Sequence, residues 1–130
     1  MAETIELEIA TPARELVRES VSEVQIPGKD GYLGILPGHA PLLGLLGTGS
    51  LVYSAGGRKK YLAIQGGFME VLPDQVRVLA DVAERAEEIN LAKAQADLSR
   101  AEAEETGPDP DKALKEVALA QARIEAAKHV

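Results

Sequence analysis

The sequence predicts an antiparallel β-sandwich or barrel followed by an antiparallel helical hairpin. Three observations support this fold class. Apolar residues recur at every second position up to about Val82, as they do in strands half buried in a sheet. Glycine- and proline-rich turns separate these short runs, with no helical segment between them. Beyond about Glu88, apolar residues recur at steps of three and four, which is the period of an amphipathic helix.

The strand-like runs begin at the N-terminal end. Ile5, Leu7 and Ile9 alternate with glutamates, and Val24 and Ile26 flank a glutamine. In the last run, one face is expected to carry Val76, Val78, Ala80 and Val82. The runs are punctuated by turn residues at 27–31, 55–57 and 73–74. The basic stretch at 56–60 lies between two such runs and is predicted to be a hairpin turn.

Two helices follow. The apolar stripe of the first is expected at Leu91, Ala94, Leu98 and Ala101, and that of the second at Val117, Ala120, Ile124 and Ala127. Asn90 is expected to cap the first helix, and Asp109 the second, with Pro110 in its first turn. Gly107 is expected to end the first helix in a left-handed conformation.

These stripes are rich in alanine, which removes little apolar area from water when it is buried. We therefore expect a weakly docked helical arm on a cohesive aliphatic β domain. The predicted boundary separates a domain at 1–87 from a mobile hairpin at 88–130.

Composition excludes several functional classes. The formal charge of −7 argues against nucleic acid or an anionic membrane surface as the main partner. Without cysteine, there is no disulfide framework and no thiolate site. The N-terminus lacks the pattern of a signal peptide, and no apolar run is long enough for a membrane span. The chain is therefore expected to be soluble and to reach a membrane only through a partner.

We find no catalytic constellation in the sequence. His39 and His129 lie far apart, so a metal site is not expected, and the serines have no nucleophile-elbow context. Acidic pairs at 87–88 and 104–105 are interpreted as solvated helix surface. Residues 28–31 lack the spacing of a phosphate-binding loop. The inventory indicates a binding or mechanical part that has no catalytic residues of its own.

Three blocks of the sequence resemble the epsilon subunits of rotary ATP synthases, which correspond to the mitochondrial delta subunits. The first block is Gly31-Tyr32-Leu33-Gly34-Ile35-Leu36-Pro37-Gly38-His39-Ala40-Pro41-Leu42-Leu43. The second is the run at 61–71, which contains Gly66-Gly67 and Glu70-Val71, and the third is the run at 76–85. The resemblance extends in order over the whole chain.

The resemblance implies a β-sandwich of about ten strands and a place on the central stalk. There the sandwich would bind the gamma subunit and stand on the ring of c subunits. The candidate contacts are Tyr32, Pro37, Gly38 and His39. Position 32 is often acidic in relatives, so an ion pair with the ring is not expected at Tyr32. Alternatively, His39 only braces its own loop.

The resemblance also implies that the hairpin either folds on the sandwich or extends along gamma into the alpha/beta catalytic head, where it blocks ATP hydrolysis. The segment from Asp111 onward has four cationic and three acidic residues, a net charge of +1. The candidate inhibitory cations are Lys112, Lys115, Arg123 and Lys128. Alternatively, these are ordinary charges of a helix surface.

Some bacterial relatives bind ATP through an Ile-Asp-x-x-Arg-Ala motif at the start of the first helix. The matching positions here are Ile89, Asn90, Lys93 and Ala94. Asn90 lacks the carboxylate charge, and Lys93 lacks the bidentate fork of arginine. We therefore expect weak or no ATP binding, and no cofactor.

The sequence therefore predicts a non-catalytic rotor subunit that couples proton flow to ATP synthesis and inhibits hydrolysis. It is expected at the cytoplasmic face of a bacterial plasma membrane, or alternatively at the stromal face of a thylakoid. The alternative function is a free-standing nucleotide-sensing module.

Overall fold

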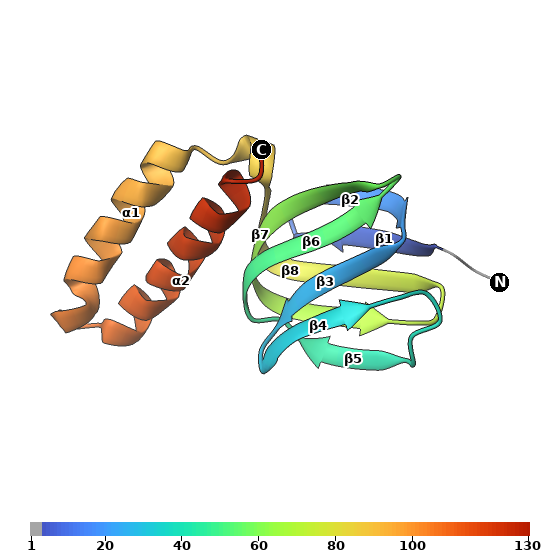
Figure 1. Ribbon diagram of the computed structural model, residues 1–130. Coiled ribbons are helices and arrows are strands. Elements are labelled where there is room, and N and C mark those ends of the chain that lie inside the picture. Colours follow the sequence, from blue (N-terminus) through green and yellow to red (C-terminus); the bar gives the residue numbers. More distant parts are fainter. Residues whose placement is uncertain (1–3) are drawn as a thin grey trace.

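The computed structural model describes residues 4–130, so the first three residues of the predicted N-terminal domain lie outside it. Eight strands precede two α-helices, and Figure 1 shows the hairpin of helices beside the strands. The strands are β1 (Ile5–Ala10), β2 (Glu15–Val21), β3 (Glu23–Gly28), β4 (Gly31–Ile35), β5 (Leu42–Leu45), β6 (Thr48–Ala55), β7 (Arg58–Val71) and β8 (Gln75–Arg85). The 3₁₀ turn η1 (Ala86–Glu88) leads to α1 (Leu91–Ala103), and η2 (Glu104–Thr106) leads to α2 (Pro110–Ala127).

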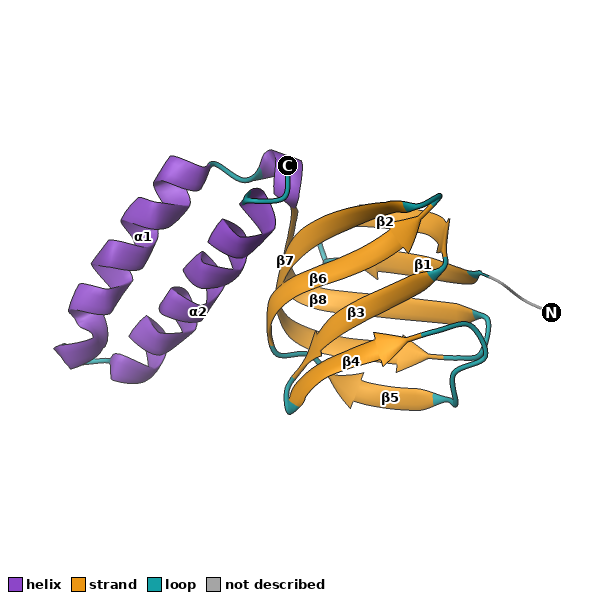
Figure 2. Cartoon of the chain, in the orientation of Figure 1, coloured by secondary structure: helices purple, strands orange, loops and turns teal. Residues whose placement is uncertain are grey.

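The strands form one continuous sheet that folds over into two layers. Its order is β2-β1-β8-β7-β6-β3-β4, and β5 pairs with β7. The first part of β7 pairs with β6, whereas its last part pairs with β5. The strands β6, β3 and β4 lie in front of β1 and β8 in Figure 1. The result is a β-sandwich, as predicted (Figure 2).

The expected count of about ten strands is corrected to eight in the described residues. The reason lies in β7 and β8, which pass from one layer to the other without a break. Gly66 and Gly67 provide the bend in β7, with φ angles of 69° and 102°. Two long strands therefore take the place of four short ones.

The same bend corrects the expected face of β8. Val76, Val78 and Ala80 are buried as predicted, but Val82 is only half-buried and Ala83 is buried instead. The side that faces the core changes where the strand crosses between layers, so a strict alternation fails there. Elsewhere the core is aliphatic, and Ile5, Leu7 and Ile9 are each at most 1% exposed.

The local signals at the helix ends are largely confirmed. Asn90 Oδ1 accepts a hydrogen bond of 3.0 Å from the Lys93 N–H, and Asp109 Oδ1 accepts one of 3.2 Å from the Lys112 N–H. The prediction for Gly107 is wrong, because its φ of −86° is not left-handed. The first helix ends at Glu104 in a right-handed conformation and tightens into η2, which removes the need for a left-handed residue.

The second helix lies between the first helix and the sandwich. On a helix that turns about 100° per residue, Ala113, Val117 and Ala120 share one face and Ala122 and Ala126 the opposite face. All five are buried. The second face joins a small apolar cluster made of Ala63, Ala86, Ala122 and Ala126, with Tyr61 and Ile89 packed against it. The hairpin thus rests on the sandwich through a mostly alanine contact, but Ala122 and Ala126 lie outside the predicted stripe, of which Ile124 and Ala127 are only half-buried.

Candidate functional site

The outer face of the sandwich carries an apolar row that crosses four strands. Leu45 of β5 pairs with Phe68 of β7, Phe68 with Leu79 of β8, and Leu79 with Ala10 of β1. Leu45 and Phe68 are 59% and 45% exposed, and Leu79 and Ala10 are partly exposed. Directly paired side chains lie next to each other on one face of a sheet. These four residues, called the apolar row below, form a continuous surface that no element of residues 4–130 covers.

The next row on the same face is charged. The register brings Leu43 beside Glu70, Glu70 beside Arg77, Arg77 beside Glu8, and Glu8 beside Arg18. Glu8 accepts a hydrogen bond of 2.8 Å from Arg18 and lies 3.7 Å from Arg77. These charges are matched within the row. The apolar row beside them is therefore the part of this face that would gain most from being buried by another chain.

A cavity of about 420 Å³ lies where β5 approaches the β3–β4 turn. Its lining residues are Gly28, Lys29, Asp30, Gly31, Tyr32, Leu33, Leu42, Leu43, Gly44, Leu45 and Met69. Among the described strands, β4 pairs only with β3 and β5 only with β7, so both are edge strands. An open edge with exposed leucines is a surface that proteins normally cover with another element or chain.

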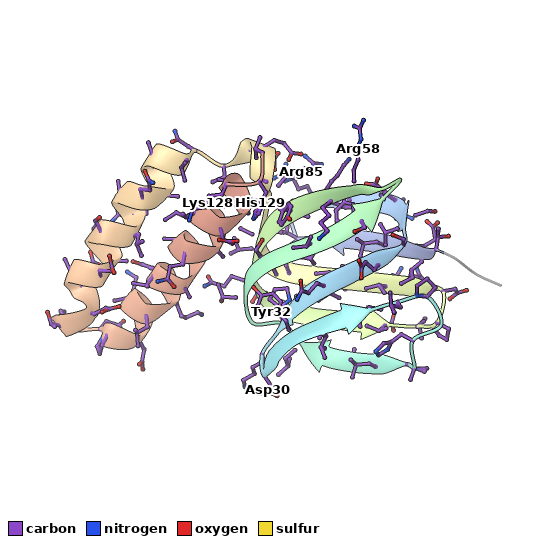
Figure 3. The ribbon with its side chains drawn as sticks, viewed as in Figure 1. Asp30, Tyr32, Arg58, Arg85, Lys128 and His129 are labelled. Carbon is purple, nitrogen blue, oxygen red and sulfur yellow. The ribbon has the colours of Figure 1, made fainter. Side chains whose placement is uncertain are left out.

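Tyr32 stands at the start of β4, on the side of the sandwich seen in Figure 3. The residue is 53% exposed, and its hydroxyl oxygen accepts a hydrogen bond of 3.1 Å from the Ser50 N–H. The hydroxyl lies over Gly49, where a Cβ atom would collide with it. The tyrosine is therefore held in place against β6 while much of its ring stays open to solvent.

The loop with Pro37, Gly38 and His39 lies at the other end of β4. The Gly38 N–H donates a hydrogen bond of 2.8 Å to the Pro73 carbonyl oxygen, which ties this loop to the β7–β8 turn. His39 Nδ1 lies 2.7 Å from the carbonyl oxygen of Ala40, so the ring contacts its own loop. At about 3.3 Å per residue, β4 keeps Tyr32 well away from this loop. The four predicted contact residues thus mark two ends of one edge.

The four predicted inhibitory cations are not gathered on one surface. Lys112 and Lys115 are exposed on α2, and Lys128, which is also exposed, follows its last residue, beside His129 (Figure 3). Arg123 instead points to the sandwich, where its Nε donates to Glu84 Oε1 at 2.5 Å. Sequence reasoning could not identify this pair because its members lie 39 positions apart.

The four positions of the degenerate nucleotide motif do come together. Ile89, Asn90, Lys93 and Ala94 line a pocket of about 200 Å³, together with Glu84, Glu88, Asp97 and Arg123. Three carboxylates thus face two cations, and Asn90 Oδ1 is already engaged in the cap of α1. The carboxylates are ion-paired, Glu88 with Arg14, Glu84 with Arg123 and Asp97 with Arg100, so Arg123 is already engaged within the pocket.

An ion-pair network at the base of the hairpin was not predicted. Arg14 donates two hydrogen bonds to the Glu88 carboxylate, at 2.9 and 2.8 Å, and Arg85 adds a backbone and a side-chain contact. The Arg14 guanidinium lowers the pKa of Glu88 to about 2. Glu88 thereby fastens η1 to the β1–β2 turn. In the sequence, the pair of glutamates at 87–88 indicated only solvated helix surface.

Two further features complete the inventory. In the part of the chain from residue 4 onward, no group of three His, Asp or Glu side chains is arranged to hold a metal ion. None of the described helices is both long enough and apolar enough to cross a membrane.

Comparison with known proteins gives one consistent family. Residues 4–86 match the model of the ATP synthase delta/epsilon chain β-sandwich domain. The chain is 59% identical over 128 residues to the ATP synthase epsilon chain of Solibacter usitatus (strain Ellin6076), covering 95% of this chain and 96% of that protein. It is 44% identical to the epsilon chain of Geobacter metallireducens, covering 95% and 92%.

Solved structures agree with this result. The chain is similar to a subunit in a Euglena gracilis mitochondrial ATP synthase structure that contains OSCP, F1 and the c-ring, with a TM-score of 0.85 and 27% identity. That match covers 99% of this chain and 84% of the other. A central-stalk and c-ring structure from Tetrahymena thermophila gives a TM-score of 0.63 at 17% identity, covering 92% and 96%, which supports the fold alone.

Proposed function

The chain belongs to the family of ATP synthase epsilon chains, and we propose that it is a central-stalk subunit that couples proton flow to ATP synthesis and restrains ATP hydrolysis. It acts as an accessory part of the complex, and the catalytic sites lie in other subunits. The observation that carries this proposal is the uncovered apolar row on a rigid sandwich.

The apolar row is the surface we assign to the gamma subunit. Leu45 and Phe68 lie at its exposed end, next to Leu43, which is 71% exposed. Aromatic and aliphatic side chains at the centre of an interface supply most of its binding free energy. The matched charges of the neighbouring row would form the polar rim. A sandwich attached in this way would turn with the rotor.

The edge between Tyr32 and the loop with Pro37, Gly38 and His39 is the surface we assign to the c-subunit ring. The loop is tied to Pro73 through Gly38, and Tyr32 is held against β6, so both ends are rigid. A rigid contact transmits torque because it does not deform under load. His39 keeps one ring nitrogen for such a contact, since its Nδ1 faces its own loop.

The hairpin is the part we assign to regulation. In this proposal residues 1–87 form the rotor-binding domain, and 88–130 form a mobile arm that extends toward the alpha/beta head. The alanine-rich contact with the sandwich supports this assignment, because such a contact is inexpensive to break. The exposed lysines Lys112, Lys115 and Lys128 are available to acidic surfaces there.

We do not assign a nucleotide to the pocket beside Asn90 and Lys93, because Arg123 is already paired with Glu84 and Asn90 is engaged in the helix cap. Relatives matched over 95% of the chain are ATP synthase epsilon chains, which argues against the alternative of a free-standing nucleotide-sensing module. A peripheral position at the cytoplasmic face of a bacterial membrane fits these bacterial relatives. A thylakoid location remains the alternative.

Binding to the gamma subunit tests the assignment of the apolar row. Phe68→Asp and Leu45→Asp place a charge at its exposed end, and we expect each to weaken binding by roughly tenfold or more. Leu114→Asp is the matched control, because Leu114 is 54% exposed on α2, away from the row. Circular dichroism would establish that each variant is folded. If Phe68→Asp is folded and binds gamma like the wild type, the row is not the contact.

A further inference from the structure

Arg123 links three elements in the folded hairpin. From α2, its Nε donates to Glu84 Oε1 of β8 at 2.5 Å, and its Nη1 lies 4.0 Å from Asp97 Oδ2 of α1. The side chains of Arg123, Glu84 and Asp97 are 25%, 27% and 18% exposed. Asp97 also lies 2.9 Å from Arg100 on its own helix, so the partly buried guanidinium depends mainly on Glu84.

The other cations of α2 are placed differently. Lys112 is 70% exposed and lies 3.9 Å from Glu116 on its own helix. Lys115 contributes only its carbonyl oxygen, which accepts a hydrogen bond of 3.0 Å from Gln65 Nε2, and Lys128 is exposed. Among the described α2 cations, Arg123 alone has its charge taken up by carboxylates of other elements.

We propose that Glu84, with the more distant Asp97 beside it, is an internal acidic partner for Arg123, and that this ion pair holds the hairpin folded without a bound ligand. When the hairpin extends, Arg123 exchanges these carboxylates for an acidic surface of another subunit. The change of partners on extension, called the exchange below, rests on the proposed function. The ion pair that holds the folded hairpin, called the lock below, does not.

Two arguments support the exchange. A partly buried guanidinium that loses its carboxylate must regain water or find another anion, and its planar fork suits carboxylates best. The remainder of the hairpin contact is weak: alanines, the Gln65 hydrogen bond, and the stack of His129 on Tyr61, with ring centroids 3.9 Å apart. A single ion pair between β8 and α2 can therefore decide whether the hairpin is folded.

The lock is tested on the isolated full chain by amide hydrogen exchange. Glu84→Gln and Arg123→Gln break the same contact, and each is expected to lower the protection of α2 amides at least about threefold, with the strands unchanged. The double variant should lose little more than either single one, because the two changes remove one interaction. Glu116→Gln is the matched control, since its partner Lys112 lies on the same helix. Unchanged α2 protection in Glu84→Gln would overturn the lock.

The exchange is tested by ATP hydrolysis of a catalytic core that lacks this subunit, with each variant added back. Glu84→Gln frees the hairpin but keeps the arginine, so inhibition should become stronger than that of the wild type. Arg123→Gln also frees the hairpin but removes the cation, so inhibition should become weaker. If both variants shift inhibition in the same direction, the exchange is wrong. If the wild type does not inhibit at all, both the change of Arg123 partners and the proposed inhibition by the hairpin are wrong. The amide hydrogen-exchange data on the isolated chain still test whether the Arg123–Glu84 pair holds the hairpin folded.

Discussion

Glu88 stands where the sandwich meets the hairpin, and its carboxylate receives two hydrogen bonds from Arg14. Its pKa falls from an ordinary 4.5 to about 2, first because of that hydrogen bonding and then because of the Arg85 backbone N–H. A carboxyl group with a depressed folded-state pKa stabilises the fold above its unfolded pKa and ceases to do so as it is protonated. The contribution of Glu88 is therefore present above about pH 4.5 and is lost as the pH falls toward 2.

Glu88→Gln should remove this pH-dependent contribution. We expect the variant to unfold at a lower urea concentration than the wild type at pH 6, with a difference that shrinks below pH 4.5 and disappears near pH 2. High salt should reduce the difference at pH 6, because the Arg14–Glu88 pair is partly exposed to solvent. Glu105→Gln, an exposed residue in the turn between the helices, is the control. An equal difference at all pH values would contradict this account.

Gly67 shows how one residue permits the sheet to change layers. Its φ is 102°, and a Cβ atom there would lie 2.1 Å from the Leu79 carbonyl oxygen. Gly67→Ala should therefore destabilise the sandwich by about 2 kcal/mol or more. Gly34→Ala is the control, since a Cβ at Gly34 meets no atom within 4 Å, and its effect should stay within about 0.5 kcal/mol. Urea unfolding of both variants measures the difference, and equal effects would refute the role of the bend.

Of the two α-helices, α2 is the one with two buried faces. Ala126 is fully buried in the cluster against the sandwich, and we expect Ala126→Leu to overfill that contact. Hydrogen exchange should then show faster exchange in α2 but unchanged protection in the strands. Ala96→Leu, on the exposed side of α1, adds the same side chain without a neighbour and should leave exchange unaltered. Loss of protection in the strands of Ala126→Leu would mean that the hairpin and sandwich are one cooperative unit.

The predictability of each element from sequence follows the range of the interactions that define it. The caps at Asn90 and Asp109 depend on side chains that bond within three residues, and both were predicted correctly. Gly107 was misassigned because the chain had a second local solution, a 3₁₀ turn at Glu104–Thr106.

Longer-range features were not predictable in this way. The apolar row joins Ala10, Leu45, Phe68 and Leu79, which are neighbours only through the register of four strands. The strand count failed for a similar reason, since no local signal tells whether a Gly-Gly pair ends a strand or bends it. The predicted contact residues at 32 and 37–39 are separated by β4, which the motif alone could not indicate.

On the scale of the whole molecule, the two parts differ in how they are held together. The sandwich has a large aliphatic core, whereas the apolar cluster between hairpin and sandwich consists of four alanines with Tyr61 and Ile89 packed against them. Because buried apolar area determines much of local stability, the hairpin should open at a lower free energy than the sandwich. This difference would let a rotor-bound sandwich stay folded while its arm moves.

The boundary between these parts matters for any truncation. Glu88 belongs to the hairpin by sequence position, yet its carboxylate binds Arg14 and Arg85 of the sandwich. A chain that stops after Glu88 keeps this network and removes both α-helices. It is therefore the suitable short form for comparison with the full chain.

The most direct measurement of the central claim is ATP hydrolysis by a catalytic core that contains gamma and lacks this subunit, assayed with the full chain and with the chain stopped after Glu88. We predict that both forms bind gamma and that only the full chain inhibits hydrolysis. If the short form binds gamma and inhibits as strongly as the full chain, the hairpin is not the brake and the account is contradicted.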